Sequence, residues 1–343
     1  METKHIDFLC KVTEMVAPSG TENEVINLWN SQISTLVDDM ILTKMGNSIA
    51  VKKGESDQKI MLVAHADEIG FIITYIDAQG FLYFDEIGGI DTNILPGSRV
   101  LIKGISGFVE GVIGVKPIHL QERGANRADL NPEDLWIDIN VASKSEALEK
   151  VQLGSVATYF PKSTLHGNRF VGKSLDNRSS LAVLLAIAQN IQNKSLKNSV
   201  YFVASTQEEL RGRGAQTAAF ELNPDICIVL DVTHATDYPS MSPVRDGDIK
   251  LGEGAVIAVG PNMNPDISQR LIAVAKDKSI NYQVEVLARP TGTDANAIQI
   301  TQSGIDTGLV SIPCRYMHSP VEVVDIRDME AVSQLLTEFL LTI

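Results

Sequence analysis

Side chains of the types that bind metals are scattered along this chain, and each lies where an apolar strand ends or in a turn marked by Gly or Pro. They are His65, Asp176, Glu209, Asp231 and His318. Distant ligands meet only in a fold that gathers several strand ends, and an open α/β sheet does so at the carboxyl ends of its strands. The pattern therefore predicts such a sheet, carrying two tetrahedral divalent-cation sites that share one carboxylate.

Length and composition set the broad class. At 343 residues the chain is long enough for two domains, and 44% hydrophobic with 21% charged residues is typical of globular proteins. A net charge of −14 disfavours nucleic acids and anionic membranes as partners. The longest apolar run, Leu181 to Ala188, is shorter than the roughly 18 residues that span a bilayer. The first residues lack the pattern of a secretory signal, so we expect a cytoplasmic protein.

The remaining Cys and His residues are weaker ligand candidates. The cysteines, Cys10, Cys227 and Cys314, are isolated and odd in number, which argues against disulfides and against a thiolate zinc site. His5 and His166 have no acidic partner at a useful spacing, and His119 falls in a β-rich segment. His234 and Asp237 compete with Asp231 but are expected deeper in a loop that follows it.

The hydrophobic pattern divides the chain into two domains. Short β-type runs separated by Gly-rich turns, with one helix at 143–150, predict a small all-β module over residues 70–161. Around it, strands and helices alternate, which predicts one α/β domain built from residues 1–69 and 162–343. The expected helices are 6–16, 25–36, 181–191 and 326–341, with a capping box at Thr21 to Glu24, and the expected strands are 60–64, 200–204 and 226–230.

His65 ends an apolar run, and Asp67 follows two residues later. Side chains alternate along a strand, so the two point the same way, and a carboxylate so placed can fix the tautomer of a ligating imidazole. The alternative is a surface His–Asp pair at a polar strand end.

Asp176 stands just before a long amphipathic helix. A rigid helix start is a suitable mount for a carboxylate that bridges two metals, but Asp is also frequent as a helix N-cap. The helix start alone leaves both interpretations open.

Glu208 and Glu209 are adjacent carboxylates just after the strand Val200–Ala204. Thr206 to Glu209 fits a capping box, which predicts helix initiation with solvated carboxylates. The doubling favours chemistry, because Glu209 can bind metal while Glu208 takes a proton from water whose pKa the metals lower only to about 7.

Asp231 and His318 complete the set. Asp231 follows the apolar run Ile226–Leu230, where a carboxylate is costly unless it is paired, solvated or ligating. His318 is expected in a turn restrained by Pro313 and Pro320, which holds an imidazole at small entropic cost. A lone His in a loop is more often structural or exposed.

Taken together, several segments resemble the tetrahedral or glutamyl aminopeptidase family, cytosolic exopeptidases with a co-catalytic metal pair. The resemblance covers nearly the whole chain, and the segments keep the family's order and spacing. They are Ala17-Pro18-Ser19-Gly20, Ala64-His65-Ala66-Asp67-Glu68-Ile69-Gly70, Ile87-Gly88-Gly89-Ile90-Asp91, Leu175-Asp176-Asn177-Arg178, Gln207-Glu208-Glu209, Asp231-Val232-Thr233 and Arg315-Tyr316-Met317-His318-Ser319-Pro320.

The resemblance implies a role for each residue. It places His65, Asp176 and Asp231 on one metal and Asp176, Glu209 and His318 on the other, with Asp176 bridging and with zinc or cobalt as the metals. It makes Glu208 the general base, has Asp67 support His65, and predicts a cis peptide bond after Asp176. It also implies a zinc-exopeptidase-like α/β/α sandwich interrupted by a barrel or PDZ-like domain, which forms dimers that assemble into a tetrahedral dodecamer.

One position departs from the family pattern. Family members commonly carry Glu-Glu-Val-Gly-Leu-Arg-Gly, whereas this chain reads Glu208-Glu209-Leu210-Arg211-Gly212-Arg213-Gly214. Arg211 therefore adds a charge close to the expected base, where it can shift a pKa or contact an acidic substrate.

The combined prediction is a cytoplasmic metallo-aminopeptidase that removes N-terminal residues from short peptides. The rivals are another hydrolase on the same metal scaffold, such as a deacylase, a carboxypeptidase or a glucanase, and a non-catalytic oligomeric binding protein. The substrate-binding residues are not assigned. Arg211, Arg213 and Lys173 are candidates for binding an acidic side chain, although each is more typical of a surface or structural cation.

Overall fold

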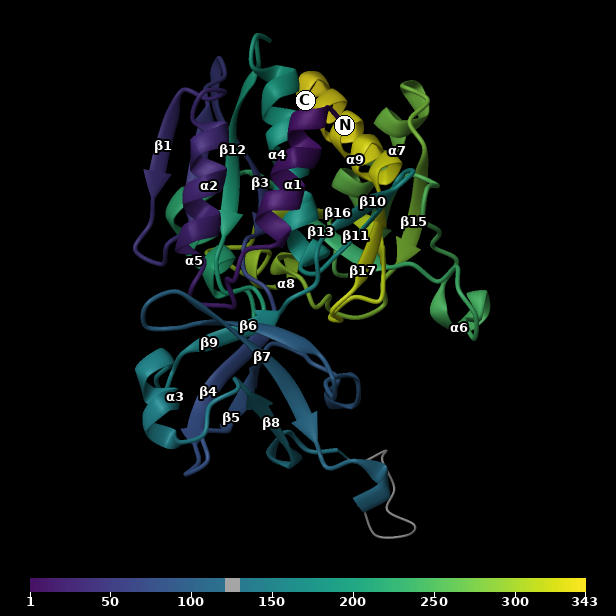
Figure 1. Cartoon of the computed structure of the whole chain (residues 1–343). Helices are drawn as coiled ribbons and strands as arrows, with labels where there is room; N and C mark the ends of the chain where they lie inside the picture. Colours follow the sequence, from purple (N-terminus) through teal and green to yellow (C-terminus); the bar gives the residue numbers. More distant parts are fainter. Residues whose placement is uncertain (121–129) are drawn as a thin grey trace.

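The computed structural model describes residues 1–120 and 130–343. It consists of a large mixed sheet with helices on both faces and, below it in Figure 1, a closed barrel of antiparallel strands. The predicted α/β class with an inserted all-β barrel is thereby confirmed. Among the described residues, no helix has the length and apolar character needed to span a bilayer.

The central strands of the large sheet run parallel, so their carboxyl ends lie at one edge. β12 pairs with β3, β3 with β13, and β13 with β16, all in parallel. In this register Ser205 lies beside His65 and Asp231 beside Ser311. The sheet order is β1 (Asp39–Leu42), β2 (Ser48–Lys52), β12 (Asn198–Ser205), β3 (Ser56–His65), β13 (Ile226–His234), β16 (Asp306–Arg315), β17 (Glu322–Asp325), β11 (Arg169–Gly172) and β10 (Thr164–His166), with β14 (Ala255–Val259) also on β16 and β15 (Tyr282–Val286) on β14.

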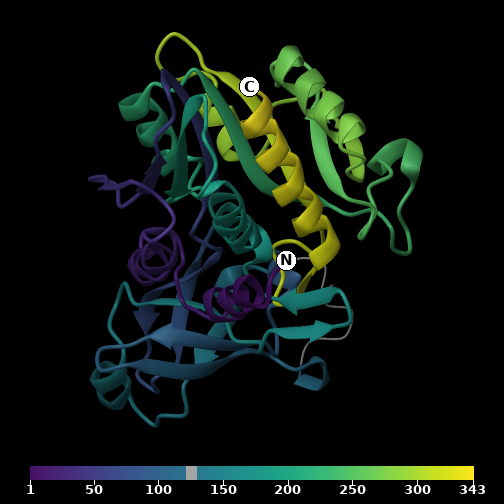
Figure 2. The same ribbon diagram turned by 90° about the horizontal axis from the view of Figure 1, so that it is seen from above.

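Helices bury both faces of this sheet, which explains why its central strands are apolar without alternation. On β3, Ile60 and Leu62 pack into one core cluster while Met61 and Val63 pack into the other. The first face carries α1 (Thr3–Thr13), α2 (Asn23–Ile33), α4 (Leu175–Ile191), α7 (Pro265–Asp277) and α9 (Ile326–Thr342), and the second carries α5 (Arg213–Leu222) and α8 (Asp294–Ile298). Figure 2 shows α1 and α9 flanking α4 on the first face. The short helix α6 (Pro243–Asp246) lies outside both clusters.

The barrel has a hydrophobic core of its own, which includes Phe71, Ile102 and Ile137. Its strands, in order around the barrel, are β4 (Gly70–Ile76), β5 (Leu82–Ile87), β8 (Leu135–Asp138), β7 (Phe108–Val115), β6 (Arg99–Lys103) and β9 (Val156–Tyr159). The predicted helix is α3 (Lys144–Lys150), capped by Ser143, and short 3-10 turns lie at η1 (Thr92–Ile94), η2 (Ile118–Leu120) and η4 (Pro132–Asp134).

The predicted capping box at the start of α2 is wrong. The N-cap residue is Glu22, which makes no capping bond. Its carboxylate instead accepts hydrogen bonds from the backbone N–H groups of Gly20 and Gln207, and the Thr21 hydroxyl donates to the Pro18 carbonyl. Glu22 therefore ties two loops together, a long-range use that local sequence cannot reveal.

Two predicted loop boundaries also need correction. β13 does not end before Asp231 but continues to His234, because it stays paired with β16 as far as Cys314. For the same reason Pro313 lies within β16 and not in the turn that carries His318. Of the two prolines expected to restrain that turn, Pro320 alone belongs to it.

Candidate metal centre

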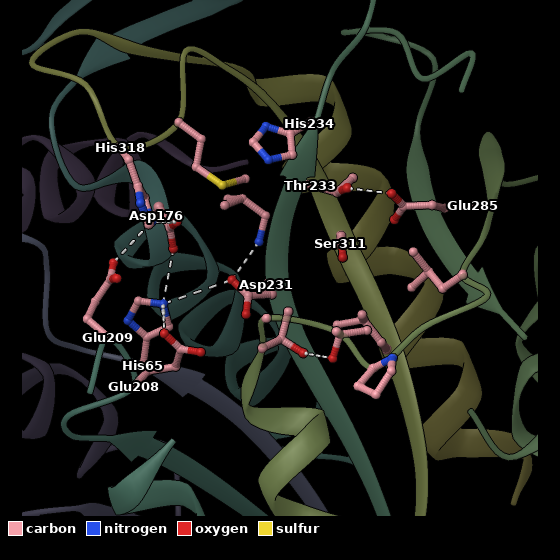
Figure 3. Close-up of a pocket in the computed structure, with 18 residues that line it drawn as sticks. His65, Asp176, Glu208, Glu209, Asp231, Thr233, His234, Glu285, Ser311 and His318 are labelled. Atoms are coloured by element: carbon pink, nitrogen blue, oxygen red, sulfur yellow. Dashed lines mark hydrogen bonds and ion pairs between the residues drawn. The ribbon is translucent and has the colours of Figure 1, made fainter. Parts of the chain in front are cut away.

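The predicted ligands meet in one cavity of about 380 Å³ at the carboxyl edge of the sheet. Figure 3 shows their side chains converging from separate elements. His65 comes from the end of β3, Asp176 from the start of α4 and Asp231 from β13, while Glu208, Glu209 and His318 come from loops. The cavity continues past these residues along β13 and β15.

Asp176 lies between two imidazoles. One of its oxygens, Oδ1, is 3.0 Å from Nε2 of His65, and the other, Oδ2, is 3.2 Å from Nε2 of His318. The N-cap of α4 is Ser174 rather than Asp176, whose backbone is not helical and whose bond to Asn177 is cis. The geometry is that of a carboxylate shared between two sites.

The Glu208–Glu209 pair lies in a turn, and the alternative prediction of helix initiation there is wrong, since α5 begins only at Arg213. The hydroxyl of Thr206 donates to the Met45 carbonyl instead of capping a helix. Glu208 Oε2 lies 3.8 Å from Nε2 of His65, and Glu209 Oε1 lies 3.4 Å from Nε2 of His318. Each carboxylate therefore faces a different imidazole.

Asp67 connects this turn to His65. Its carboxylate is fully buried and accepts the backbone N–H groups of Glu208 at 3.0 Å and Glu209 at 3.1 Å. Ser19 donates its hydroxyl at 2.5 Å, and Nδ1 of His65 lies 3.3 Å away. Burial raises the pKa of Asp67, but the contacts with His65 and Ser19 outweigh it and lower the pKa overall. A charged Asp67 can thus hold His65 with Nε2 directed at the cavity.

His318 is oriented by the barrel and by a buried carboxylate. We assign Nδ1 as the donor to the Gly89 carbonyl, 2.7 Å away in the loop after β5, which leaves Nε2 free to bind metal. A Cβ atom at the neighbouring Gly88, which has a φ of +81°, would lie 3.0 Å from Oε2 of Glu209, so glycine at this position leaves room for the carboxylate. Glu322 accepts the backbone N–H groups of His318 at 2.9 Å and Asp176 at 3.1 Å.

Ser19, Gly89 and Glu322 also support the site, and the sequence did not single them out. Ser19 and Gly89 fall in segments of the family resemblance, but their roles depend on how loops meet in space. Glu322 had a weak signal, a carboxylate next to an apolar pair at the start of a strand. Burial, together with the charge of Asp176, raises the pKa of Glu322 to about 8.

The donor set fits divalent cations. Four buried or nearly buried carboxylates, those of Asp176, Glu208, Glu209 and Asp231, face only two imidazoles. Burial and neighbouring negative charges raise the pKa of Glu208 and of Asp231 well above the ordinary carboxyl value. Among the described residues no Lys or Arg forms an ion pair with any of the four. Such a cluster is costly unless cations compensate its charge.

Distances divide the candidate ligands into groups that share residues. Ligand atoms of His65, Asp176 and Asp231 lie within 4.8 Å of one another, and so do those of Asp176, Glu209 and His318. His65, Glu208 and Glu209 satisfy the same distance. The first two groups have Asp176 in common and match the two sites that the family resemblance implies, whereas Glu208 occurs only in the third group.

The weaker candidates belong to none of these ligand groups. Asp237 forms an ion pair of 2.7 Å with Arg315, and His234 lines the cavity but belongs to none of the ligand groups. Lys173 is buried and pairs with Glu68 at 2.7 Å, and burial lowers the pKa of its amine to about 8. Arg211 is exposed, has a φ of +74°, and lines a smaller cavity next to Glu208.

The known proteins that this chain is similar to include a family of aminopeptidases. The model of the M42 glutamyl aminopeptidase family matches residues 46–335. A lysyl aminopeptidase of Pyrococcus furiosus is 36% identical over 330 residues, which cover 94% of this chain and 93% of that protein. A TET aminopeptidase of the archaeon Thaumarchaeota archaeon SCGC AB-539-E09 has a TM-score of 0.95 at 30% identity, over 99% and 96% of the two chains. PhTET1-12s, solved as a dodecamer, has a TM-score of 0.88 at 30% identity over the full length of both chains.

Proposed function

The chain belongs to the M42 glutamyl aminopeptidase family, and on that premise we propose that it is a metal-dependent aminopeptidase that uses two divalent cations, zinc or cobalt, in each chain. Its class is accordingly that of a peptide hydrolase. The observation that carries the proposal is the position of Asp176, whose two oxygens face His65 and His318. Asp231 would complete one site and Glu209 the other.

Glu208 is the proposed general base. The residues of the two groups would hold the cations, whose chemistry would be to polarise a peptide carbonyl and to lower the pKa of water, so that a base is needed to remove a proton. Glu208 lies at the wall of the cavity, where it can accept that proton and return it to the leaving amine. Burial is the largest influence on Glu208 and raises its pKa, which suits a group that must both take and release a proton. The carboxylate of Asp67 positions both residues, because it accepts the backbone N–H of Glu208 and lies beside Nδ1 of the His65 imidazole.

Activity assays would test this function against its rivals. We expect the protein loaded with zinc or cobalt to cleave aminoacyl anilides that have a free amine, to lose that activity on exposure to a chelator, and to recover it when either metal is returned. N-acylated amino acids and cellulose derivatives should remain intact. Cleavage of acylated amino acids in place of the anilides would assign a deacylase, and chelator-resistant cleavage of cellulose would assign a glycosidase.

We further propose that the module of residues 70–161 joins pairs of chains, while residues 1–69 and 162–343 form the catalytic unit. The barrel exposes large apolar side chains, of which Tyr75, Ile105 and Phe108 are each more than half exposed. Exposed apolar side chains of this size are candidates for burial between two chains. By analogy with the dodecamer of PhTET1-12s, twelve chains are expected in the assembly. Light scattering should give that mass for the native protein and a smaller one for Phe108→Asp, whereas a native monomer would contradict the proposal.

A further inference from the structure

The cavity of the metal centre extends to a second group of side chains on β13, β15 and β16. Because β13 continues past Asp231, Thr233 projects from the same face of the strand, about 7 Å further along. The hydroxyl of Thr233 donates to Oε1 of Glu285 on β15 at 2.8 Å. Figure 3 shows Glu285 across the cavity from His65 and Glu208.

Glu285 is a half-buried carboxylate without a fixed cation. Within residues 1–120 and 130–343, its hydrogen-bond partner is Thr233, and no Lys or Arg forms an ion pair with it. Burial raises the pKa of Glu285, while the hydrogen bond from Thr233 and the nearby His234 oppose this effect. A cation from a ligand would therefore find an acceptor whose second oxygen, Oε2, takes part in no hydrogen bond within the described chain.

The walls around Glu285 suit the stem of a long side chain. Leu309 is buried and Leu287 half-buried, and both line the cavity beside the carboxylate. Lysine and arginine place apolar methylene groups against such walls while their charged ends reach a polar partner. None of the described residues that line this cavity is Lys or Arg, so it offers no fixed cationic side chain to an acidic substrate.

We propose that Glu285 makes the enzyme select peptides whose N-terminal residue is lysine or arginine. The inference rests on the proposed function, since the N-terminal residue would have to lie at the candidate metal centre for its side chain to extend toward β15. The ammonium or guanidinium group then pairs with Glu285, a charge-assisted hydrogen bond in a half-buried site. An acidic side chain placed there is repelled by the same carboxylate.

Arg211 is the group that argues for the opposite preference, because it lines a smaller cavity beside Glu208 and Glu209. Its side chain is exposed, however, and in that cavity it stands next to two carboxylates. The larger cavity, which holds all the metal-ligand candidates, contains Glu285 instead. The observations therefore favour a basic substrate side chain.

Steady-state kinetics on Lys-, Leu- and Glu-anilides would test the assignment. The native enzyme should show a kcat/KM for the Lys substrate at least tenfold above that for the Glu substrate. Glu285→Gln keeps the shape and the bond from Thr233, so the ratio of Lys to Leu activity should fall by about 10- to 100-fold. Glu285→Lys should lower Lys cleavage further and raise Glu cleavage. The matched control is Glu149→Gln on exposed α3, which should retain the native ratios.

A binding measurement separates this inference from the proposed function. The two probes are free lysine and norleucine, whose side chain has a similar length but no charge. Calorimetry should show that the native protein binds lysine at least tenfold more tightly than norleucine. In Glu285→Gln this difference in affinity should disappear. If no anilide is cleaved, the aminopeptidase function fails while the binding comparison still decides the role of Glu285. The proposal for Glu285 is overturned if the kcat/KM of the native enzyme for the Leu or Glu substrate equals that for the Lys substrate, or if Glu285→Gln keeps the native selectivity. In either case the aminopeptidase function stands.

Discussion

Replacing Glu208 with Gln is expected to lower turnover of an aminoacyl anilide by a factor of about 10² to 10⁴, the usual contribution of a general base. The variant keeps the shape of the side chain and the backbone N–H that bonds to Asp67, so the fold and the bound metal should be unchanged. What it loses is the ability to accept a proton. The loss should therefore fall mainly on kcat.

The Glu208 experiment needs a control for the removal of one negative charge. Glu221→Gln, on the exposed end of α5, removes the same charge away from the cavity and should keep native turnover. Metal content and the thermal midpoint should be measured for both variants. Native turnover by Glu208→Gln, with its metal in place, would remove this residue from the mechanism.

Replacing Asp176 with Asn is expected to have an effect at least as large, because this residue belongs to both proposed metal sites. An amide carries no charge and has one coordinating oxygen, so it cannot bridge two cations in the same way. We expect the variant to retain neither cation after dialysis and to lose at least about a thousandfold in kcat/KM, which corresponds to ~4 kcal/mol of transition-state stabilisation.

Asp237→Asn is the matched control for Asp176→Asn. Asp237 competed for the ligand role in the sequence but pairs with Arg315 in the structure, so its variant should keep both cations and its activity. The metal content of the two dialysed variants would be compared by inductively coupled plasma mass spectrometry. Full metal content in Asp176→Asn, or loss of metal in Asp237→Asn, would mean that the bridging residue has been misassigned.

The parts of the fold that were predictable are those where burial leaves a pattern. Continuous apolar runs gave β3 and β12 because both faces of the central sheet are covered. Strands at the margins have no such pattern: every residue of β1 is exposed, and β15 is at most half-buried. Their position is set by pairing with neighbours, which a single sequence does not encode locally.

The candidate site also has residues that the sequence pattern indicated and residues that it did not. Residue type and position at strand ends singled out His65, Glu208 and Glu209 as candidates, and the structure brings all three to one cavity. The supports of the ligands were hidden, because Glu322 and the Gly89 carbonyl act through contacts between distant segments. Glu285 was hidden too, since its contact with Thr233 depends on β13 running further than its apolar residues indicated.

The central claim is that Asp176 holds two cations in one site, and the number of metal ions in each chain tests it most directly. The native protein would be incubated with zinc or cobalt, freed of unbound metal by gel filtration, and measured by plasma mass spectrometry against its protein concentration. We expect two ions in each chain. A value of one or of none, in protein whose fold is intact, would contradict the paired site.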